Sequence, residues 1–228
     1  MFFIDVETTG VTSKDRLCSV ALLEEEKLHF TLVQEVKKIP PLASSVHNIT
    51  TEMIQNAPRF VETSLYQHLC SLDEKILVAH NAMFDIEMLG YSGYVHQGKM
   101  IDTLRCTRHL IPDLEQYSLN FLRYEMKLYQ KEKALAQHYG VTLPLVPHDA
   151  QSDVIITKLL LEELLLLAPK EQLLLLSTTP VLLQKFPFGK YAGRYIEEIA
   201  LSDRSYLAWM VTLEDLDEDM RYTLEYYL

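Results

Sequence analysis

The sequence predicts an α/β fold, in which a mixed five-stranded sheet is flanked by helices and a small C-terminal module follows. Short apolar strands succeed one another in the first third of the chain, and strands then alternate with helical segments. A boundary lies between Ala168 and Pro187, where a short helix and the sequence STTP separate the main domain from the rest of the chain. At 228 residues, the chain is long enough for one full domain and a small addition.

The N-terminal strands form an antiparallel meander in this prediction. Residues 2–7, 17–23 and 27–33 are the strands, and a run of three glutamates at 24–26 makes a charged turn between the last two. The Pro- and Ser-rich stretch 37–60 is predicted to be a long ordered loop with one short helix near 51–55.

The middle of the chain supplies the remaining strands and most of the helices. A helix at 64–72 leads into a short apolar strand at 75–79, and Asn81 is the expected N-cap of the helix that follows. The later elements are a strand at 99–101, helices at 103–110, 118–128 and 131–139, and a long helix at about 149–167.

We therefore expect a main domain over 1–168, a linker with a short helix over 169–185, and a module over 186–228. The leucines of 159–176 are assigned to the core. They are not expected to span a membrane, because Glu163 and Pro169 interrupt the apolar run well before the roughly 20 residues that a span needs. No basic segment precedes the apolar start of the chain, so no secretory signal is predicted.

The net charge of −11 argues against a protein that binds nucleic acid by bulk electrostatics. Two features weaken that objection: metal ions would neutralise part of the carboxylates, and basic residues cluster locally at 105–108, 123–133 and 185–194. The three cysteines are widely spaced and form no CxxC pair, so neither a disulfide framework nor a zinc site is predicted. A cytoplasmic location fits this cysteine usage.

Two carboxylates interrupt the apolar stretch FFIDVETTG at residues 2–10. Side chains alternate along a strand, so Asp5 and Glu7 share one face with Phe3, and the apolar Ile4 and Val6 lie on the other. Both charges are therefore expected to point the same way from a well-anchored strand.

Three further residues are expected at the same edge of the sheet. Asp85 lies on the helix that follows strand 75–79, and sites in open α/β sheets form outside the strand ends. His148 precedes the last long helix, and Asp153 lies in its first turn. Carboxylates about 4 Å apart repel by roughly 4 kcal/mol at an effective dielectric near 20. Two Mg²⁺ or Mn²⁺ ions would offset this repulsion, and paired metals are the known arrangement for phosphodiester hydrolysis.

Three motifs in this order resemble those of the DnaQ-like exonuclease superfamily, in its DEDDh branch. They are DVETTG with Asp5 and Glu7, HNAMFD ending in Asp85, and HDAQSD with His148 and Asp153. The segment 186–210 also resembles the small module that follows the nuclease domain in bacterial proteins of the exonuclease X group. The resemblance implies an RNase H-like fold and 3′→5′ release of nucleoside 5′-monophosphates.

The resemblance also implies roles for the catalytic residues. Asp5, Glu7 and Asp153 would hold the first metal ion, Asp5 would bridge to the second, and Asp85 would reach the second. His148 would be the general base, a task that suits an imidazole near neutral pH. The resemblance further places a set of residues around the terminal nucleotide: Thr8, Thr9, Val11, His47, His80, Asn81 and Phe84. Backbone N–H groups near Thr8 and Thr9 would recognise the 3′-hydroxyl.

Structural explanations compete with these functional ones at several positions. His80 and Asn81 are explained equally well as a strand-end residue and a helix cap, and His47 by loop packing. Asp149 resembles a helix cap more than a ligand and is left out of the site. Lys190 and Arg194 are either solvated turn residues or phosphate contacts.

The leading interpretation is a metal-dependent 3′→5′ exodeoxyribonuclease that acts on single-stranded or frayed duplex DNA 3′ ends, in DNA repair or end processing. Three alternatives stay open: a 3′→5′ exoribonuclease that trims RNA ends, a polymerase proofreading subunit, and a non-catalytic nucleic-acid-binding module. The catalytic residues do not themselves distinguish the two sugars. No membrane partner is expected.

Overall fold

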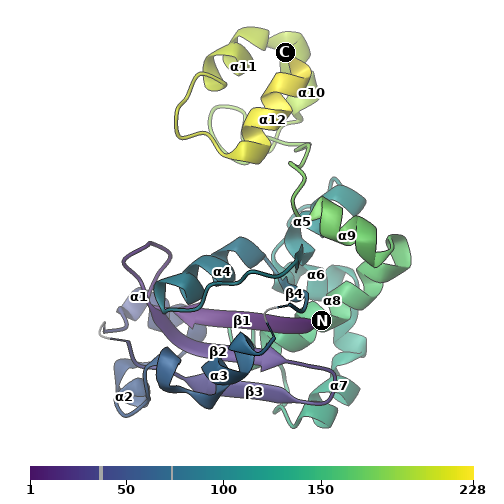
Figure 1. Cartoon of the computed structure of the whole chain (residues 1–228). Coiled ribbons are helices and arrows are strands. Elements are labelled where there is room, and N and C mark those ends of the chain that lie inside the picture. Colours follow the sequence, from purple (N-terminus) through teal and green to yellow (C-terminus); the bar gives the residue numbers. More distant parts are fainter. Residues whose placement is uncertain (36–37, 73) are drawn as a thin grey trace.

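In the computed structural model, which describes residues 1–35, 38–72 and 74–228, the chain folds around a five-stranded sheet with the order β3-β2-β1-β4-β5 (Figure 1). The strands are β1 (Phe2–Thr8), β2 (Leu17–Leu23), β3 (Leu28–Leu32), β4 (Leu77–Ala79) and β5 (Met100–Asp102). The first three strands pair antiparallel, whereas β4 and β5 run parallel to β1. The predicted mixed five-stranded sheet is confirmed.

The helices surround the sheet and continue into the C-terminal module. Those before β5 are α1 (Pro41–His47), α2 (Thr51–Ile54), the 3₁₀ helix η1 (Phe60–Glu62), α3 (Ser64–Cys70) and α4 (Ala82–Tyr91). Those from β5 to the end of the main domain are α5 (Thr103–Leu110), α6 (Leu119–Glu125), the 3₁₀ helix η2 (Leu128–Gln130), α7 (Glu132–Tyr139), α8 (Ala150–Leu167) and α9 (Lys170–Leu176). The last three are α10 (Ile196–Ser202), α11 (Arg204–Met210) and α12 (Glu218–Tyr227).

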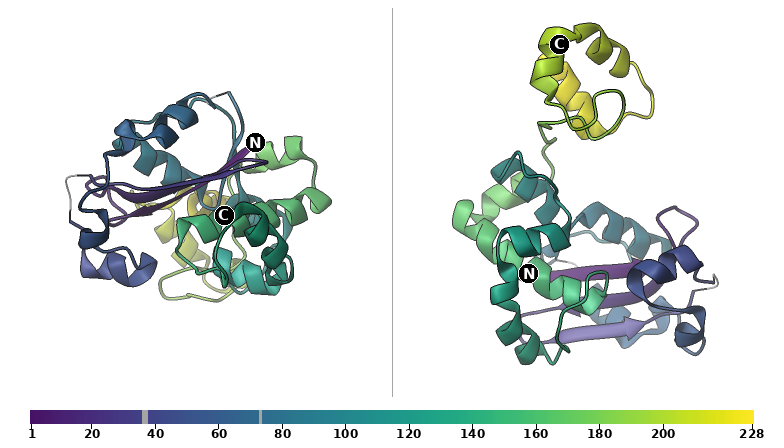
Figure 2. Two further views of the ribbon diagram at one scale, coloured as in Figure 1. Left: turned by 90° about the horizontal axis from the view of Figure 1, so that it is seen from below. Right: turned by 180° about the vertical axis from the view of Figure 1, so that it is seen from behind.

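The two faces of the sheet carry separate cores, because side chains alternate along β1. Phe2, Ile4 and Val6 pack with α3 and α4 on one face. Phe3 packs on the other face with α5 to α9, where α8 is the longest element. Figure 2 shows helices on both sides of the sheet when it is seen edge-on. Asp5 and Glu7 therefore lie on the α8 face.

The C-terminal module has a core of its own and stands apart from the sheet (Figure 1). Leu207 and Met210 are buried there, whereas Trp209 from the same helix is 55% exposed. α9 does not belong to the module, because Leu173 is fully buried in the core of the main domain, where α9 packs against α5 and β5. The connection to the module is the extended segment that follows α9.

Several sequence predictions need correction. The expected loop at 37–60, whose first residue lies outside the described part, also contains α1, which begins with a proline in its first turn, where the missing N–H has no helical partner. The predicted helix at 118–128 ends at Glu125, and a 3₁₀ turn follows. The leucine-rich stretch is only partly core, since Leu166 is 79% and Leu175 is 64% exposed.

Two expectations from composition can be compared with the structure. Cys18, Cys70 and Cys106 are all free thiols. Across the described ranges, no helix is both long enough and apolar enough to cross a bilayer.

Candidate active site

The site is built on β1. Phe3 and Val6 on its two faces are at most 8% exposed, and they hold the strand between the two cores. The pairing of β1 with β2 is regular up to Glu7 and shifts register between Glu7 and Thr8. The two carboxylates of β1 therefore stand on a fixed backbone, close to the point where the strand departs from the sheet.

α8 supplies the third carboxylate. Asp149 caps this helix by accepting a hydrogen bond from the Ser152 N–H at 3.1 Å, as its position in the sequence predicts. Asp153 lies in the first turn, and its carboxylate accepts a hydrogen bond from the His148 N–H at 3.0 Å. One oxygen from each of Asp5, Glu7 and Asp153 lies within 4.8 Å of the other two.

Burial and mutual repulsion act together on these carboxylates. Burial, followed by the charges of Asp153 and Asp85, raises the pKa of Asp5 well above its ordinary value. Burial raises the pKa of Glu7 to about 8, and the charge of Asp153 adds to the effect. Burial also raises the pKa of Asp153 to about 7, although the hydrogen bond from His148 opposes the shift. Burial and mutual repulsion therefore disfavour the state in which all three carboxylates are ionised, and a bound cation would offset this cost.

This donor set fits a divalent metal ion. All the donors are carboxylate oxygens, which Mg²⁺ and Mn²⁺ prefer, and their convergence is costly unless positive charge is present.

Asp85 lies apart from these three oxygens. It is 2% exposed on α4, and its carboxylate accepts a hydrogen bond from the Val6 N–H at 3.1 Å. Burial raises its pKa, and the charges of Asp102 and Glu7 contribute. Asp85 therefore contacts β1 between the two carboxylates of that strand, although it is not one of the three whose oxygens meet.

His148 lies on the surface in the loop between α7 and α8, with a left-handed backbone φ of 58°. Its side chain borders a cleft of about 400 Å³ that Asp5 and Asp153 also line. The cleft is also lined by His80, Asn81, Arg108 and Tyr117, among others. The third sequence motif thus reaches the same cavity as the first.

The three residues of the HNAMFD motif that are expected to contact the substrate differ in how accessible they are. His80 has both ring nitrogens engaged, with the Thr103 hydroxyl at 3.0 Å and the Tyr117 carbonyl oxygen at 2.9 Å. Burial lowers the pKa of His80. Asn81 is exposed in the cleft, and Phe84 is half-buried against the α3–α4 side of the sheet.

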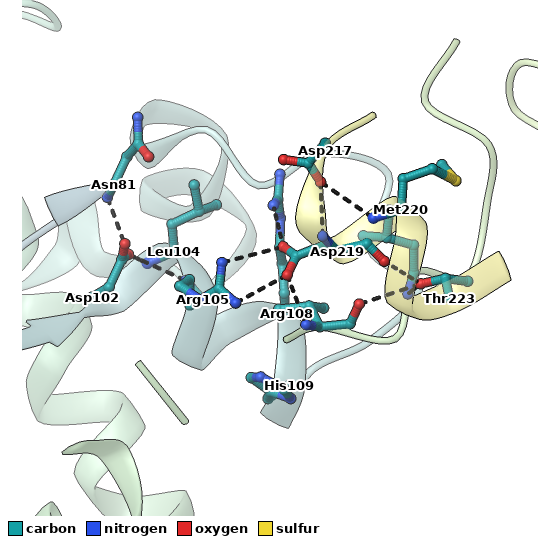
Figure 3. Close-up of polar contacts among 12 residues, drawn as sticks. Asn81, Asp102, Leu104, Arg105, Arg108, His109, Asp217, Asp219, Met220 and Thr223 are labelled. Atoms are coloured by element: carbon teal, nitrogen blue, oxygen red, sulfur yellow. Dashed lines mark hydrogen bonds and ion pairs between the residues drawn. The ribbon is translucent and has the colours of Figure 1, made fainter. Parts of the chain in front are cut away.

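Asn81 is the residue before α4, but its side chain does not cap the helix. The cap is supplied by the Asp102 carboxylate at the end of β5, which accepts hydrogen bonds from the N–H groups of Asn81 and Ala82 at 3.1 and 3.0 Å. The same carboxylate also caps α5 (Figure 3). Asn81 therefore occupies the predicted N-cap position, but the capping hydrogen bonds come from Asp102 and the Asn81 side chain lines the cleft.

Residues 8–11 are held by a turn around Asp15. The Thr9 hydroxyl donates to the Asp15 carboxylate at 3.0 Å, and the Thr9 N–H donates to the Arg16 carbonyl at 2.8 Å. The Thr9 N–H is therefore engaged within the chain, contrary to the expectation that it would be offered to a 3′-hydroxyl. Val11 is 80% exposed.

His47 is buried beneath the end of β1. Its Nδ1 accepts a hydrogen bond from the Ile49 N–H at 3.0 Å, so Nε2 carries the proton and donates to the Thr8 carbonyl at 3.2 Å. Burial lowers the pKa of this imidazole, which is consistent with a neutral ring. His47 therefore supports Thr8, and its ring nitrogens are both used within the chain.

The structure adds three residues that sequence reasoning missed. Asp102 holds the N-termini of α4 and α5 together. Arg108 and Tyr117 line the cleft. The sequence carries a signal for two of them: Arg108 belongs to the basic cluster at 105–108, and Asp102 stands directly before a predicted helix, a position where aspartate is favoured as a cap.

The three local basic clusters are mostly neutralised within the chain. Arg123 is buried against Glu132 and Lys131 pairs with Glu163. Lys190 pairs with Asp203 at 3.1 Å. The clusters expected to attract nucleic acid are therefore largely parts of ion pairs.

The fold and the buried carboxylates beside the cleft are those of a hydrolytic nuclease, and the carboxylates can hold a divalent metal ion. Residues 2–161 match the exonuclease family RNase_T, and the chain belongs to that family. This confirms the resemblance to DnaQ-like exonucleases that the three motifs indicate. The family uses divalent metal ions.

The relatives extend the match beyond the nuclease domain. Exodeoxyribonuclease 10 of Escherichia coli (strain K12) is 31% identical over 232 residues, which cover 99% of this chain and 97% of that protein. DNA polymerase III subunit epsilon of Treponema pallidum (strain Nichols) is 30% identical, but over 54% of this chain and 63% of its own. A solved structure of exonuclease X in complex with 5′ overhanging duplex DNA superposes with a TM-score of 0.59 at 24% identity, covering 77% of this chain and 98% of that one.

Proposed function

We propose that this protein is a 3′→5′ exodeoxyribonuclease that releases nucleoside 5′-monophosphates from DNA ends. The observation that carries the proposal is the meeting of the Asp5, Glu7 and Asp153 oxygens within 4.8 Å, beside a cleft that His148 borders. Such a site combines acidic ligands with a titratable group at the surface, as hydrolysis of a phosphodiester requires.

Two Mg²⁺ or Mn²⁺ ions are the proposed cofactors. Asp5, Glu7 and Asp153 would hold the first, and Asp5 together with Asp85 would hold the second. When bound, the ions supply positive charge to the attacking and leaving oxygens of an in-line displacement. The raised pKa of Glu7, about 8, supports a need for bound cations at neutral pH.

His148 is the proposed general base. Its position at the mouth of the cleft leaves the imidazole free to accept a proton from the attacking water, while its backbone N–H orients Asp153. Because the ring lies on a loop before α8 and not inside the helix, it can adjust to the substrate.

The 3′-terminal nucleotide is proposed to lie near Thr8, Thr9 and Val11, where exposed Val11 can pack against a base. Asn81 and Phe84 would contact it from α4. His80 and His47 act instead as positioning residues in this proposal, since the ring nitrogens of both are already hydrogen-bonded within the chain.

DNA is favoured over RNA because the relative that spans 99% of this chain is named an exodeoxyribonuclease. The proofreading alternative is less well supported, since the polymerase subunit matches 54% of the chain. We further propose DNA repair or end processing as the setting and the cytoplasm as the location. The proposed nuclease domain is 1–168, the linker at 169–185 contains the short helix α9, whose Leu173 packs into the core of the nuclease domain, and the proposed module is 186–228.

The test is digestion of 3′- and 5′-labelled DNA and RNA, single- and double-stranded, side by side in Mg²⁺. We expect 5′-labelled DNA to shorten stepwise and 3′-labelled DNA to release labelled mononucleotide at once. Preferential digestion of RNA would support the exoribonuclease alternative. Shortening from the 5′ end, or no hydrolysis of any substrate, would contradict the proposal.

A further inference from the structure

A groove of about 500 Å³ runs between the nuclease domain and the C-terminal module. Arg108, Leu114 and Tyr117 line it from the nuclease side, and Leu183, Phe186 and Phe188 line it from the module side. Phe188 is 45% exposed, so an aromatic face is presented to the open groove.

Polar contacts hold the two walls of the groove in place (Figure 3). Asp219 of α12 is 3% exposed and accepts hydrogen bonds from the Arg105 guanidinium at 2.9 and 3.3 Å. The same carboxylate accepts the Val181 N–H at 2.9 Å. On the other side of the groove, Lys185 and the Tyr195 hydroxyl both bind Asp113, at 2.7 and 2.8 Å. The module is therefore anchored to α5 and to the loop after it.

The groove continues the active-site cleft. Arg108 and Tyr117 line both cavities, and the Arg108 guanidinium lies 5.7 Å from the centre of the Tyr117 ring. The parallel strands β1, β4 and β5 have their carboxyl ends on the same side of the sheet. A path across these strand ends leads from β1 to β5 and α5, and then to the module. Thr8 and Thr9 mark the β1 end of this path.

We propose that this groove binds the bases of the substrate strand that lie upstream of its 3′-terminal nucleotide. The inference rests on the proposed function, because it takes the terminal nucleotide to lie near Thr8 and Thr9. A strand that starts there and crosses the carboxylates leaves the cleft on the Arg108 and Tyr117 side, where the groove opens.

The chemistry of the lining favours bases over phosphates. Lys185 is paired with Asp113, and Arg108 lies 3.8 Å from Asp219, so little unpaired positive charge faces the groove. Aromatic and aliphatic faces dominate, and stacking on aromatic rings is tolerant of sequence because every base has a π face. Binding in the groove should therefore depend weakly on salt, unlike binding through phosphates.

The first experiment measures KM for single-stranded DNA oligonucleotides from two to ten nucleotides long. Hydrolysis of the dinucleotide by the unmodified protein tests the proposed function, because a dinucleotide contains the scissile bond and offers the groove only one upstream base. KM should fall as length increases, and Phe188→Ala should raise KM for the longest oligonucleotide by about 5- to 100-fold, the equivalent of one lost stacking contact.

Tyr226→Ala is the matched control, since Tyr226 is an aromatic residue of the module that is 63% exposed and does not line the groove. Its KM values should equal those of the unmodified protein. If the dinucleotide is hydrolysed but Phe188→Ala matches the control at every length, the groove proposal is wrong and the proposed function stands. If no substrate is hydrolysed, the proposed function is wrong, and the groove proposal, which rests on it, is wrong as well.

The second experiment does not depend on turnover. The chain has one tryptophan, Trp209, which does not line the groove, so its fluorescence should not respond to an oligonucleotide. Phe188→Trp places a reporter in the groove, and we expect a ten-nucleotide DNA strand to quench it when Ca²⁺ replaces Mg²⁺. Fluorescence anisotropy of a labelled strand would establish the concentrations at which the DNA binds. If the Phe188→Trp fluorescence is not quenched at those concentrations, nucleic acid is excluded from the groove, and a protein partner is left as its occupant.

Discussion

Replacing Arg123 should destabilise the protein strongly, although this residue touches no carboxylate of the site. Arg123 is 4% exposed. Its guanidinium donates from Nε and Nη2 to the two Glu132 oxygens at 2.8 and 2.6 Å and from Nη1 to the Leu145 carbonyl at 3.1 Å. Leu145 lies in the loop that leads to His148. The residue therefore ties that loop to α6 and α7.

The expected magnitude follows from burial. Arg123→Met leaves the Glu132 carboxylate buried without its partner, and breaking a buried pair in this way costs about 3–5 kcal/mol. The double variant Arg123→Met/Glu132→Leu removes both charges, so it should lose only about 1 kcal/mol, mainly from the Leu145 carbonyl. Lys158→Met is the matched control, because its partner Glu162 is 47% exposed and such surface pairs contribute about 0–1 kcal/mol.

The assay is urea unfolding followed by circular dichroism, with kcat measured on the same samples. Arg123→Met should also lower kcat, since the loop that carries His148 loses an anchor. A single variant as stable as the Lys158→Met control, or a double variant less stable than Arg123→Met alone, would refute the reasoning.

Three further predictions concern other parts of the site. The pKa values of Glu7 and Asp153 in the folded protein, about 8 and 7, lie above those of ordinary carboxyl groups, so the folded metal-free protein binds protons more tightly than the unfolded chain. The free energy of unfolding should therefore decrease as the pH rises from about 4 to about 8. In EDTA the melting temperature should fall between pH 5.5 and 8, and Mg²⁺ should restore it at pH 8; a flat profile would contradict this. Asp102→Ala removes the acceptor for backbone N–H groups of both α4 and α5, and should cost about 2–4 kcal/mol in urea unfolding, against no change if the caps are dispensable. Gly10→Ala places a Cβ 2.7 Å from the Asp15 carboxyl, and should lower stability by about 1–3 kcal/mol and raise KM for DNA; an unchanged KM would show that the turn does not shape the substrate site.

Local sequence patterns predict those features of the architecture that depend on residues close together in the sequence. The alternation in β1 placed Asp5 and Glu7 on one face, and Asp149 was assigned to a helix cap because aspartate suits that position. The sequence does not predict α1, because Pro40 and Pro41 favour a loop there, although proline also begins helices.

The candidate site needed more than local patterns. Nothing near Asp153 in the sequence shows that it meets Asp5, which is far away along the chain, and only the combined motifs linked them. The contacts of Arg123, and the contact of Asp102 with α4, cannot be assigned from the sequence because these partners are set by packing of distant segments. Asn81 is the opposite case. Its residue type suits a helix cap, but the Asp102 carboxylate at the end of β5 accepts the hydrogen bonds from the N-terminus of α4 in its place.

The most direct test of the central claim compares hydrolysis of a 5′-labelled single-stranded DNA by the unmodified protein and by Asp153→Asn in Mg²⁺. The claim is that Asp5, Glu7 and Asp153 form the catalytic metal centre. It predicts stepwise shortening from the 3′ end by the unmodified protein and at least a thousandfold slower shortening by the variant, which should remain folded because it loses repulsion between buried carboxylates. Equal rates for the two proteins would contradict the claim.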